Sequence, residues 1–542
     1  MNFMPDKKKI TRWGAKLLVQ SFVLRNIHYK RKNAPVLDRI KLKTGELLLD
    51  GYKKNKISVL SGFLLPAEIL HLYGVSPIFT EFLAPITTIT QRSPQFLKST
   101  EIEGLSRDMC TFHRSTFGAY LQNYLPDYDL VVATSHLCDG QNKTLEELSR
   151  RMQSPYILID VPQEDSAGAR QYLADQLREL EDKLIELTGK PRATQQEWEQ
   201  VINLSNQSRE LLLRINELKA LPGSPLHGLE GFNLNLSCLL SMGTGFLRDN
   251  LSRLLRELEN CTHDNPEEDK SFRLLWLLAY PYVQNYRITG MIQELGMKPV
   301  ADELSSVSWS PLDASDPYHA LAGKMLENPF LGPIENRIQN IWELVQKYDV
   351  HGVLHFSHWG CRQGCGAIRA LSDNLDAMQV PFLELHGDCI DDRQFGEGQI
   401  RTRLASFAEL MKKNRNAGDL KPGKKDDLYL GIDVGSETAK AVIVDGDKNV
   451  HSRHVLYTGA SAKKSISSLY EQIYLQEETS GRIKACVATG YGRNAVFFAE
   501  EIVTEITCHA RGMAHAVEGV RTIIDIGGQD TKAISVDRQG GV

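Results

Sequence analysis

The sequence predicts an α/β protein with two tandem Rossmann-like domains joined by a helical insert. Three observations support this fold class. Short apolar segments alternate with helical patterns, this arrangement occurs twice along the chain, and a leucine-rich helical stretch lies between the two copies. Strands that alternate with helices are typical of parallel βαβ units. The 542 residues are enough for three or more domains, each with its own core.

Composition and charge describe an ordinary globular protein. The chain has 63 basic and 68 acidic residues, a net charge of −5, and 42% hydrophobic residues. Its longest apolar runs, around 59–70 and 274–283, are short and interrupted, so we expect no membrane span. Residues 1–50 are predicted to form a basic helical segment. A solvated helix face is favoured over the alternative, an arm that binds a membrane surface or nucleic acid, and no nucleic-acid partner is expected. No signal-peptide pattern is present, which favours a cytoplasmic protein in which disulfides are rare.

The two copies of the repeat are expected at residues 51–165 and 266–412. In the first, PAEILHLYGVSPIFTE follows the strand-like KISVL, and in the second ITGMIQELGMKPVADE follows FRLLWLLA. Three residues of each copy fall in the same places: Gly74, Pro77 and Glu81, and Gly296, Pro299 and Glu303. Further on, DLVVATSHLC at 129–138 matches GVLHFSHWGC at 352–361, and the strand-like PYILID and PFLELH follow. Each copy therefore predicts a parallel sheet with helices between its strands.

The predicted helical insert spans residues 166–265. Leucines that advance by three and four residues form an apolar stripe, which is typical of a buried helix face: Leu173, Leu177, Leu180, Leu184 and Leu187. Thr194 and Glu197 have the spacing of a capping box and predict the start of a second helix.

Five of the nine cysteines occupy positions that suggest a shared site. Cys138, Cys361 and Cys389 follow predicted strands, Cys365 lies one helical turn after Cys361, and Cys110 begins a predicted helix. Ligands of parallel α/β sheets bind beyond the carboxyl ends of strands, so these thiols are expected to converge if the two domains face each other. Zinc and iron–sulfur clusters are both compatible with cytosolic thiolates, and the absence of C-x2-C pairs favours a cluster. The alternative is that each cysteine is a small buried residue.

The pattern PAEILHLYG, SRDMC, SHLCDG, HFSHWGCRQ and GDCIDDRQFGEGQIRTRLASFAELM resembles the D-component family of 2-hydroxyacyl-CoA dehydratases and the related double-cubane-cluster proteins. The resemblance covers about residues 50–412. It implies that Cys110, Cys138 and Cys361 hold a [4Fe-4S] cluster with one open iron. Cys365 and Cys389 then remain unused, and this surplus favours a double-cubane [8Fe-9S] cluster in which they are also ligands.

Four polar residues are candidates for contact with a substrate. His136 and His358 recur as SH-x-C and SH-x-x-C, which places them beside cysteines, where they either bond to cluster sulfur or substrate or serve as structural histidines. Ser61 and Glu68 follow the first strand, where the resembling dehydratases place substrate-binding groups. The alternative for Glu68 is a helix-surface carboxylate.

Residues 413–427 are predicted to be a linker, and residues 428–542 carry a second pattern. LYLGIDVGSETAKAVIV and TIIDIGGQDTKAISV each place an acidic residue and glycines between two strands, an arrangement that binds phosphate through backbone N–H groups. With ATGYGRN and TEITCHARG, they resemble the BadF/BadG/BcrA/BcrD-type activator ATPases of the actin-like (ASKHA) superfamily. The resemblance implies nucleotide-binding positions at Asp433, Gly435, Ser436, Asp525, Gly527, Gly528 and Gln529. An actin-like ATPase encloses its nucleotide with two lobes, so this partial lobe is expected to bind ATP and magnesium only when completed.

Together, the two resemblances imply an iron–sulfur reductase that receives low-potential electrons from an ATP-dependent activator, fused or separate. A second hypothesis is a subunit of an (R)-2-hydroxyacyl-CoA dehydratase, a lyase that acts through a ketyl radical. A third is a non-catalytic electron carrier or metal-stabilised scaffold. The expected partners are reduced ferredoxin or flavodoxin as donor, a second copy or a related subunit, and a small-molecule or acyl-CoA substrate.

Overall fold

The structure is a computed structural model, and it describes residues 36–542 except for 222–223, 225, 227, 262–269, 283–284, 305, 392, 394, 417–426, 436–437, 458–461, 475–481, 527–530 and 538–540. The chain divides into two compact units, Met1–Gly396 and Glu397–Val542. Each unit has its own buried apolar clusters. Most of the expected N-terminal segment, residues 1–35, lies outside the described residues.

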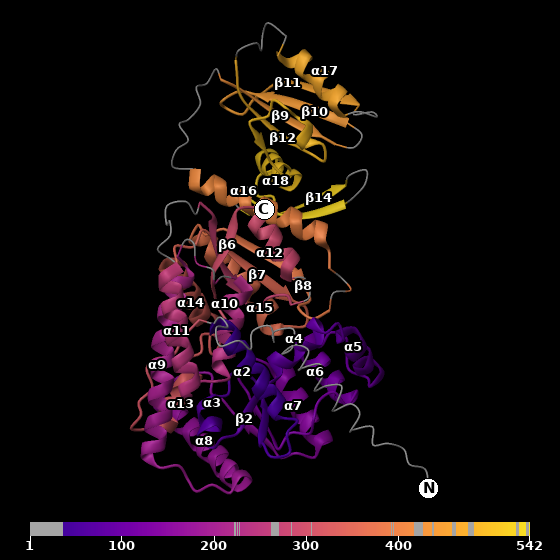
Figure 1. Cartoon of the computed structure of the whole chain (residues 1–542). Helices are drawn as coiled ribbons and strands as arrows, with labels where there is room; N and C mark the ends of the chain where they lie inside the picture. Colours follow the sequence, from indigo (N-terminus) through magenta and orange to yellow (C-terminus); the bar gives the residue numbers. More distant parts are fainter. Residues whose placement is uncertain are drawn as a thin grey trace. The chain divides into compact units, whose positions relative to one another are not determined.

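The first sheet of the first unit has four parallel strands in the order β2-β1-β3-β4. Every residue of its two central strands is buried, as expected for a sheet covered on both faces. Figure 1 shows the helices around this sheet. The elements are α2 (Val36–Asp50), β1 (Ser58–Ser61), α3 (Ala67–Leu72), β2 (Ser76–Phe79), α4 (Thr80–Ile89), α5 (Ser93–Ile102), α6 (Thr111–Leu121), β3 (Leu130–Thr134), α7 (Asp139–Met152) and β4 (Tyr156–Ile159).

The second sheet repeats this topology, with parallel strands in the order β6-β5-β7-β8. The predicted mixed α/β class with parallel sheets is therefore confirmed. The glycines shared by the repeat, Gly74 and Gly296, precede equivalent strands, and both have positive φ angles (67° and 70°) that favour glycine. The elements are β5 (Phe272–Leu277), α12 (Asn285–Glu294), β6 (Met297–Asp302), α13 (Pro317–Leu326), α14 (Ile334–Lys347), β7 (Gly352–His358), α15 (Arg362–Ala377) and β8 (Phe382–Gly387).

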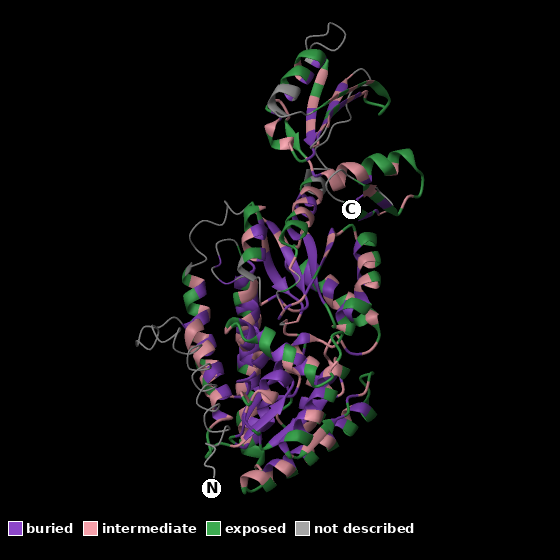
Figure 2. Cartoon of the chain, turned by 90° about the vertical axis from the view of Figure 1, so that its right-hand side faces the viewer, coloured by how far each residue is buried: buried purple, intermediate pink, exposed green. Residues whose placement is uncertain are grey.

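Four helices lie between the two sheets in sequence: α8 (Ala167–Thr188), α9 (Gln195–Lys219), α10 (Gly228–Leu239) and α11 (Gly245–Cys261). The predicted capping box at the start of α9 is confirmed, since Thr194 accepts from the backbone of Glu197 and Glu197 accepts from that of Thr194. The predicted stripe on α8 is also confirmed, with Leu173, Leu177, Leu180 and Leu184 buried and Leu187 packed against the same core. Figure 2 shows the buried residues concentrated in the sheets and the inner helix faces.

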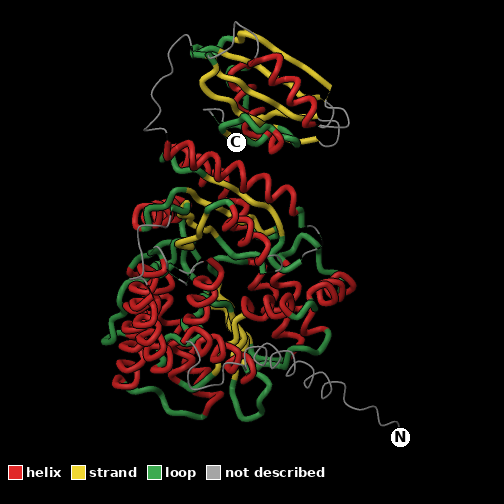
Figure 3. Tube along the Cα trace, turned by 45° about the horizontal axis from the view of Figure 1, so that its top comes forward, coloured by secondary structure: helices red, strands yellow, loops and turns green. Residues whose placement is uncertain are grey.

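The second unit begins with α16 (Glu397–Asn416), so the chain is helical in the first part of the expected linker 413–427. A mixed sheet follows in the order β11-β10-β9-β12-β13, and β14 pairs with β15 in a separate hairpin. Figure 3 distinguishes these strands from the helices. The remaining elements are β9 (Leu428–Val434), β10 (Thr438–Val444), β11 (Val450–Tyr457), α17 (Ala462–Tyr474), β12 (Ile483–Thr489), β13 (Glu501–Ile502), α18 (Glu505–Ala516), β14 (Thr522–Ile526) and β15 (Thr531–Ser535).

Across the described ranges, every helix is too short or too polar to cross a lipid bilayer.

Candidate functional site

Three of the predicted cysteines stand at the N-termini of three helices. Cys110 is the N-cap of α6, Cys138 that of α7, and Cys361 that of α15. The last two follow the equivalent strands β3 and β7 of the two sheets. Of the three, Cys361 accepts a capping hydrogen bond on its sulfur atom. The Gly364 N–H donates to this Sγ at 3.4 Å. Such a donor favours a thiolate, the form that binds metals.

The structure brings these three cysteines together. Burial raises the pKa of all three thiols, and it raises that of Cys138 to about 11. The nearness of Cys138 and Cys361 raises the pKa of Cys110 further. The positive φ of Gly360 (80°) brings its Cα so close to Cys110 that an added Cβ would lie 2.8 Å from the Cys110 backbone nitrogen. The loop before Cys361 therefore packs directly against Cys110.

A cluster fits this group of thiols. Three thiols that burial keeps protonated would be stabilised as thiolates by bound iron. Nowhere in the described part of the chain do three His, Cys, Asp or Glu side chains lie close enough to bind one metal ion. Sulfur atoms around a four-iron cluster lie farther apart than those around a single ion, so the wider spacing is compatible with a cluster.

Cys365 and Cys389 lie beside the same group but in different surroundings. Cys389 is fully buried, and Cys110 and Cys361 contribute to the raised pKa of its thiol. Cys365 is exposed on α15, where burial and then Cys361 raise its pKa, and its thiol donates to the His358 carbonyl at 3.6 Å. By contrast, burial alone raises the pKa of Cys238 on α10.

Both ring nitrogens of His358 take part in hydrogen bonds. The Cys389 backbone N–H donates to its Nδ1 at 3.1 Å, and its Nε2 lies 3.2 Å from the sulfur of Cys110. Because Nδ1 accepts, neutral His358 carries its proton on Nε2 and donates to Cys110. A second histidine that the sequence did not reveal, His113, places its Nε2 3.2 Å from the sulfur of Cys138. His113 lies one turn after Cys110 on α6, and only this helical spacing could have indicated it.

His136, the repeat counterpart of His358, is different. Its side chain is 2% exposed, and both ring nitrogens lack a hydrogen-bond partner among the described residues. Burial lowers its pKa to about 4, so the imidazole is neutral at neutral pH. The two histidines therefore differ in their environments: His358 contacts a cysteine, and the ring nitrogens of His136 have no partner among the described residues.

Ser61 and Glu68, the other two predicted contact residues, are both fully buried. The Ser61 hydroxyl has no partner among the described residues. Glu68 accepts from Lys324 Nζ at 2.6 Å and from the Ser205 hydroxyl at 2.7 Å, and Lys324 also lies 4.8 Å above the ring of Trp309. This ion pair holds the pKa of Glu68 below its ordinary value despite burial. Glu68 thus fixes the position of Lys324, and its predicted contact with substrate remains a prediction.

The repeated glutamates Glu81 and Glu303 have unlike environments. Glu303 forms a two-point ion pair with Arg337, at 2.6 and 2.9 Å. Glu81 receives only neutral donors, from the Phe63 backbone and from the Thr80 and Gln141 side chains. Burial raises its pKa to about 7, and its carboxylate contributes to the raised pKa of Cys138. Sequence reasoning used Glu81 only as a marker of the repeat and missed this proton-exchanging group beside the cysteines.

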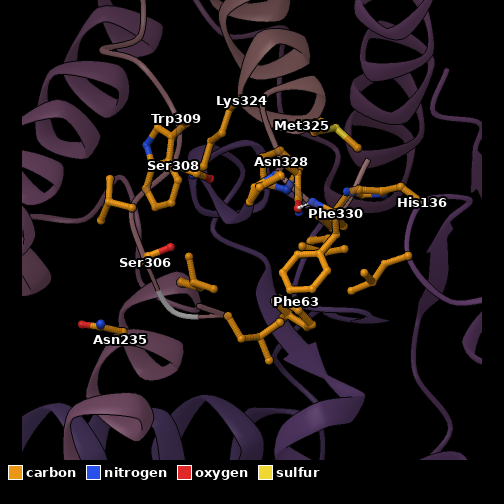
Figure 4. Close-up of a pocket in the computed structure, with 18 of the residues that line it drawn as sticks. Phe63, His136, Asn235, Ser306, Ser308, Trp309, Lys324, Met325, Asn328 and Phe330 are labelled. Carbon is orange, nitrogen blue, oxygen red and sulfur yellow. Dashed lines mark hydrogen bonds between the residues drawn. The ribbon is translucent and has the colours of Figure 1, made fainter. Parts of the chain in front are cut away.

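A cavity of about 840 Å³, including space open to solvent, lies next to this site. His136 and Leu137, which immediately precede Cys138, form part of its lining, together with Phe63, Trp309, Lys324 and Phe330. Figure 4 shows His136 near Asn328 and Phe330, with Trp309 and Lys324 at another part of the wall.

In the second unit, Asp433 is the last residue but one of β9, and its carboxylate lies 3.5 Å from Lys440 Nζ. The Gly435 N–H closes the turn by donating to the Thr438 carbonyl. Gly490 passes so close to Asp433 that an added Cβ would clash with its carboxylate. Asp525 lies on the separate β14–β15 hairpin and pairs with His509. The predicted positions Ser436, Gly527, Gly528 and Gln529 lie outside the described residues.

A family model of the 2-hydroxyglutaryl-CoA dehydratase D-component matches residues 63–411, well over half of the chain. The chain belongs to this family. The five candidate ligand cysteines all lie within the matched residues. A second model, of the BadF/BadG/BcrA/BcrD ATPase family, matches residues 430–542. Both resemblances expected from the sequence are therefore confirmed.

The D-component protein is similar along most of its length to named dehydratase subunits. It is 23% identical over 367 residues to the (R)-phenyllactyl-CoA dehydratase alpha subunit of Clostridium sporogenes, covering 65% of this chain and 89% of that protein. It is 20% identical over 392 residues to the lactoyl-CoA dehydratase subunit alpha of Anaerotignum propionicum, covering 66% and 92%.

The C-terminal part is similar to activators of such enzymes. It is 42% identical over 116 residues to the activator of lactoyl-CoA dehydratase from Anaerotignum propionicum, covering 21% of this chain and 44% of that activator. The chain thus spans less than half the length of the activator that it matches.

Proposed function

We propose that the chain is the iron–sulfur subunit of an ATP-dependent 2-hydroxyacyl-CoA dehydratase. In this proposal, 51–165 and 266–412 are two Rossmann-like domains, and Cys110, Cys138 and Cys361 hold a [4Fe-4S] cluster between them. The observation that carries the proposal is the grouping of three thiols from both halves at the N-termini of α6, α7 and α15. Such a position beyond parallel strands is typical of ligand sites in α/β proteins.

The cluster, when bound, supplies a low-potential electron and an open iron for the substrate. The residues of the chain perform the proton chemistry and the positioning. Glu81, with a pKa of about 7, exchanges protons near neutral pH and can protonate the hydroxyl group that leaves. His136 and Ser61, whose polar side-chain atoms have no partner in the described part of the chain, offer hydrogen bonds to the substrate. His358 positions the Cys110 sulfur.

We also propose that the second unit contributes part of the activator that delivers electrons from reduced ferredoxin or flavodoxin. Its nucleotide-binding positions would be Asp433, Gly435, Ser436, Asp525, Gly527, Gly528 and Gln529. ATP and magnesium would bind when the remainder of an activator is supplied within the same protein or by another chain. Tethering donor and acceptor raises their effective concentration without any new contact.

A second candidate is an iron–sulfur reductase with a double-cubane [8Fe-9S] cluster. Cys389 and Cys365 favour it, because the thiol of each is close enough to Cys361 for their charges to interact. In that case both would also be ligands. The two candidates differ in the iron content of the protein and in its substrate.

The deciding experiment measures iron and acid-labile sulfide per chain in full-length protein purified without oxygen. About four irons, unchanged in Cys365→Ser and lost in Cys138→Ser, are expected for the dehydratase. About eight irons that decrease in Cys365→Ser would favour the reductase. Cys238→Ser is the matched control, because burial alone perturbs its thiol. Zinc, or iron unaffected by Cys138→Ser, would rule out both candidates. Intact iron without turnover in the presence of activator and acyl-CoA would favour an electron carrier.

A further inference from the structure

We propose that the cavity beside Cys138 binds the acyl group of the substrate and selects an uncharged 2-hydroxyacyl chain over one that ends in a carboxylate. The inference rests on the proposed function and names the substrate class of that site. Three features of the cavity lining carry it: one histidine with free bonding capacity, two charged residues that are already paired, and aromatic walls.

His136 supplies the polar contact. Its imidazole lines the cavity and is 2% exposed, and neither ring nitrogen has a partner among the described residues. A buried polar group without a partner costs free energy, so a ligand that bonds to it gains affinity. Each ring nitrogen can form one hydrogen bond. A hydroxyl group next to a thioester carbonyl offers a partner to each.

Each charged residue of the lining is compensated by a partner outside the lining. Lys324 is held by Glu68 at 2.6 Å, with exposed side-chain fractions of 10% and 0%. Glu303, the other charged residue of the lining, is held by Arg337, with fractions of 0% and 4%. Neither pair leaves a net charge for a ligand. A carboxylate brought into this cavity would lose its hydration and would meet the charges of Glu68 and Glu303 without an uncompensated cation.

The walls suit an apolar chain. Phe63, Trp309 and Phe330 line the cavity, and Figure 4 shows Trp309 at one part of its wall and Phe63 and Phe330 at another. Aromatic rings that surround a few polar groups are typical of sites that bury the apolar part of a small ligand. The CoA part, which carries phosphates, gains nothing from this lining and would stay outside it.

The test compares (R)-2-hydroxyisocaproyl-CoA with (R)-2-hydroxyglutaryl-CoA, whose acyl chains have similar lengths and differ in the terminal carboxylate. Dissociation constants are measured by calorimetry on the full chain purified without oxygen, with free CoA as the baseline. The isocaproyl compound should bind at least about tenfold more tightly. In Glu68→Gln, which keeps the bond to Ser205 and leaves the Lys324 charge uncompensated, the preference should shrink or reverse.

A second variant keeps the proposal testable if Glu68→Gln does not fold. His136→Leu removes no side-chain hydrogen bond to any described residue, so its thermal unfolding should match that of the parent. The parent should bind 2-hydroxyisocaproyl-CoA more tightly than isocaproyl-CoA, which lacks the hydroxyl group, and His136→Leu should lose this difference.

Equal binding of the two hydroxyacyl-CoAs, tighter binding of the glutaryl compound, or binding no better than free CoA would overturn the inference. Turnover of either compound with an activator would still support dehydratase function. Conversely, a Glu68-dependent preference without any turnover would support the selectivity and count against dehydration.

Discussion

The Nε2 atom of His358 lies 3.2 Å from the sulfur of Cys110, although the two residues are 248 positions apart in the sequence. The other ring nitrogen accepts the Cys389 backbone N–H, so the orientation of the ring and the position of its proton are both fixed. One histidine of the second half thus donates to a cysteine of the first. A hydrogen bond to a ligand sulfur stabilises the more negative, reduced state of a cluster.

The His358→Leu substitution is therefore expected to lower the reduction potential of the bound cluster, because the sulfur of Cys110 loses its donor. A redox titration followed by electron paramagnetic resonance measures this change. The matched control is His386→Leu on β8, whose side chain is 49% exposed and pairs with Glu384. An unchanged potential in His358→Leu, with its iron retained, would contradict this assignment of the donor.

Gly360→Ala should reduce the iron content of the protein. The residue has a φ angle of 80°, and an added Cβ would meet the Cys110 backbone nitrogen at 2.8 Å and the Asp108 carbonyl at 2.9 Å. Neither backbone group can turn aside, so Cys361 and Cys110 must separate. Gly366→Ala on α15 has open space around its Cβ and serves as the control. Full iron content in Gly360→Ala would show that this close approach is not required.

Lys324→Met should destabilise the protein by about 3–5 kcal/mol, because it leaves Glu68 charged and unpaired in the interior. Denaturation by urea measures the loss. The double variant Lys324→Met/Glu68→Gln should recover most of it, since both charges are then removed. Arg369→Ala, which breaks an exposed pair with Asp373, should change stability little. If the double variant were as unstable as Lys324→Met, packing rather than charge would explain the cost.

His355, fully buried on β7, should make the protein sensitive to acid. Burial, followed by the nearby Arg337 and His386, lowers its pKa to about 3. At pH values between the ordinary histidine pKa and about 3, His355 binds a proton in the unfolded chain but not in the folded chain. The free energy of unfolding therefore decreases as pH falls through this range. His355→Phe should weaken this dependence in urea unfolding at pH 4 to 7. An unchanged slope would assign the acid sensitivity to other groups.

Local patterns predicted the local structure. Alternating strands and helices indicated the two parallel sheets, the spacing of Thr194 and Glu197 indicated the start of α9, and the repeated glycines lie at equivalent turns. These features depend on neighbouring residues, which a sequence displays directly. The convergence of Cys110, Cys138 and Cys361 was also expected, because the repeat placed two of them after equivalent strands.

The environments of the site residues could not be predicted in the same way. The position of Glu68 after the first strand made it a candidate for contact with substrate. Its ion-pair partner, Lys324, lies 256 residues away in the sequence. Glu81 and Glu303 are equivalent in the repeat, yet only Glu303 faces an arginine, and this difference determines which of them has a raised pKa. Burial and charge pairing arise from packing between distant segments, so they cannot be predicted from the spacing of residues along the chain.

The contact between Cys110 and His358 also has a consequence for biosynthesis. Translation at about 5–20 residues per second separates the appearance of two residues 248 positions apart by roughly 10–50 s. During that interval the thiols of the first half have emerged from the ribosome without the histidine and the cysteine of the second. Iron delivered to a nascent chain would meet an incomplete set of ligands. If Cys110, Cys138 and Cys361 hold the proposed cluster, its insertion would therefore follow the folding of the second sheet.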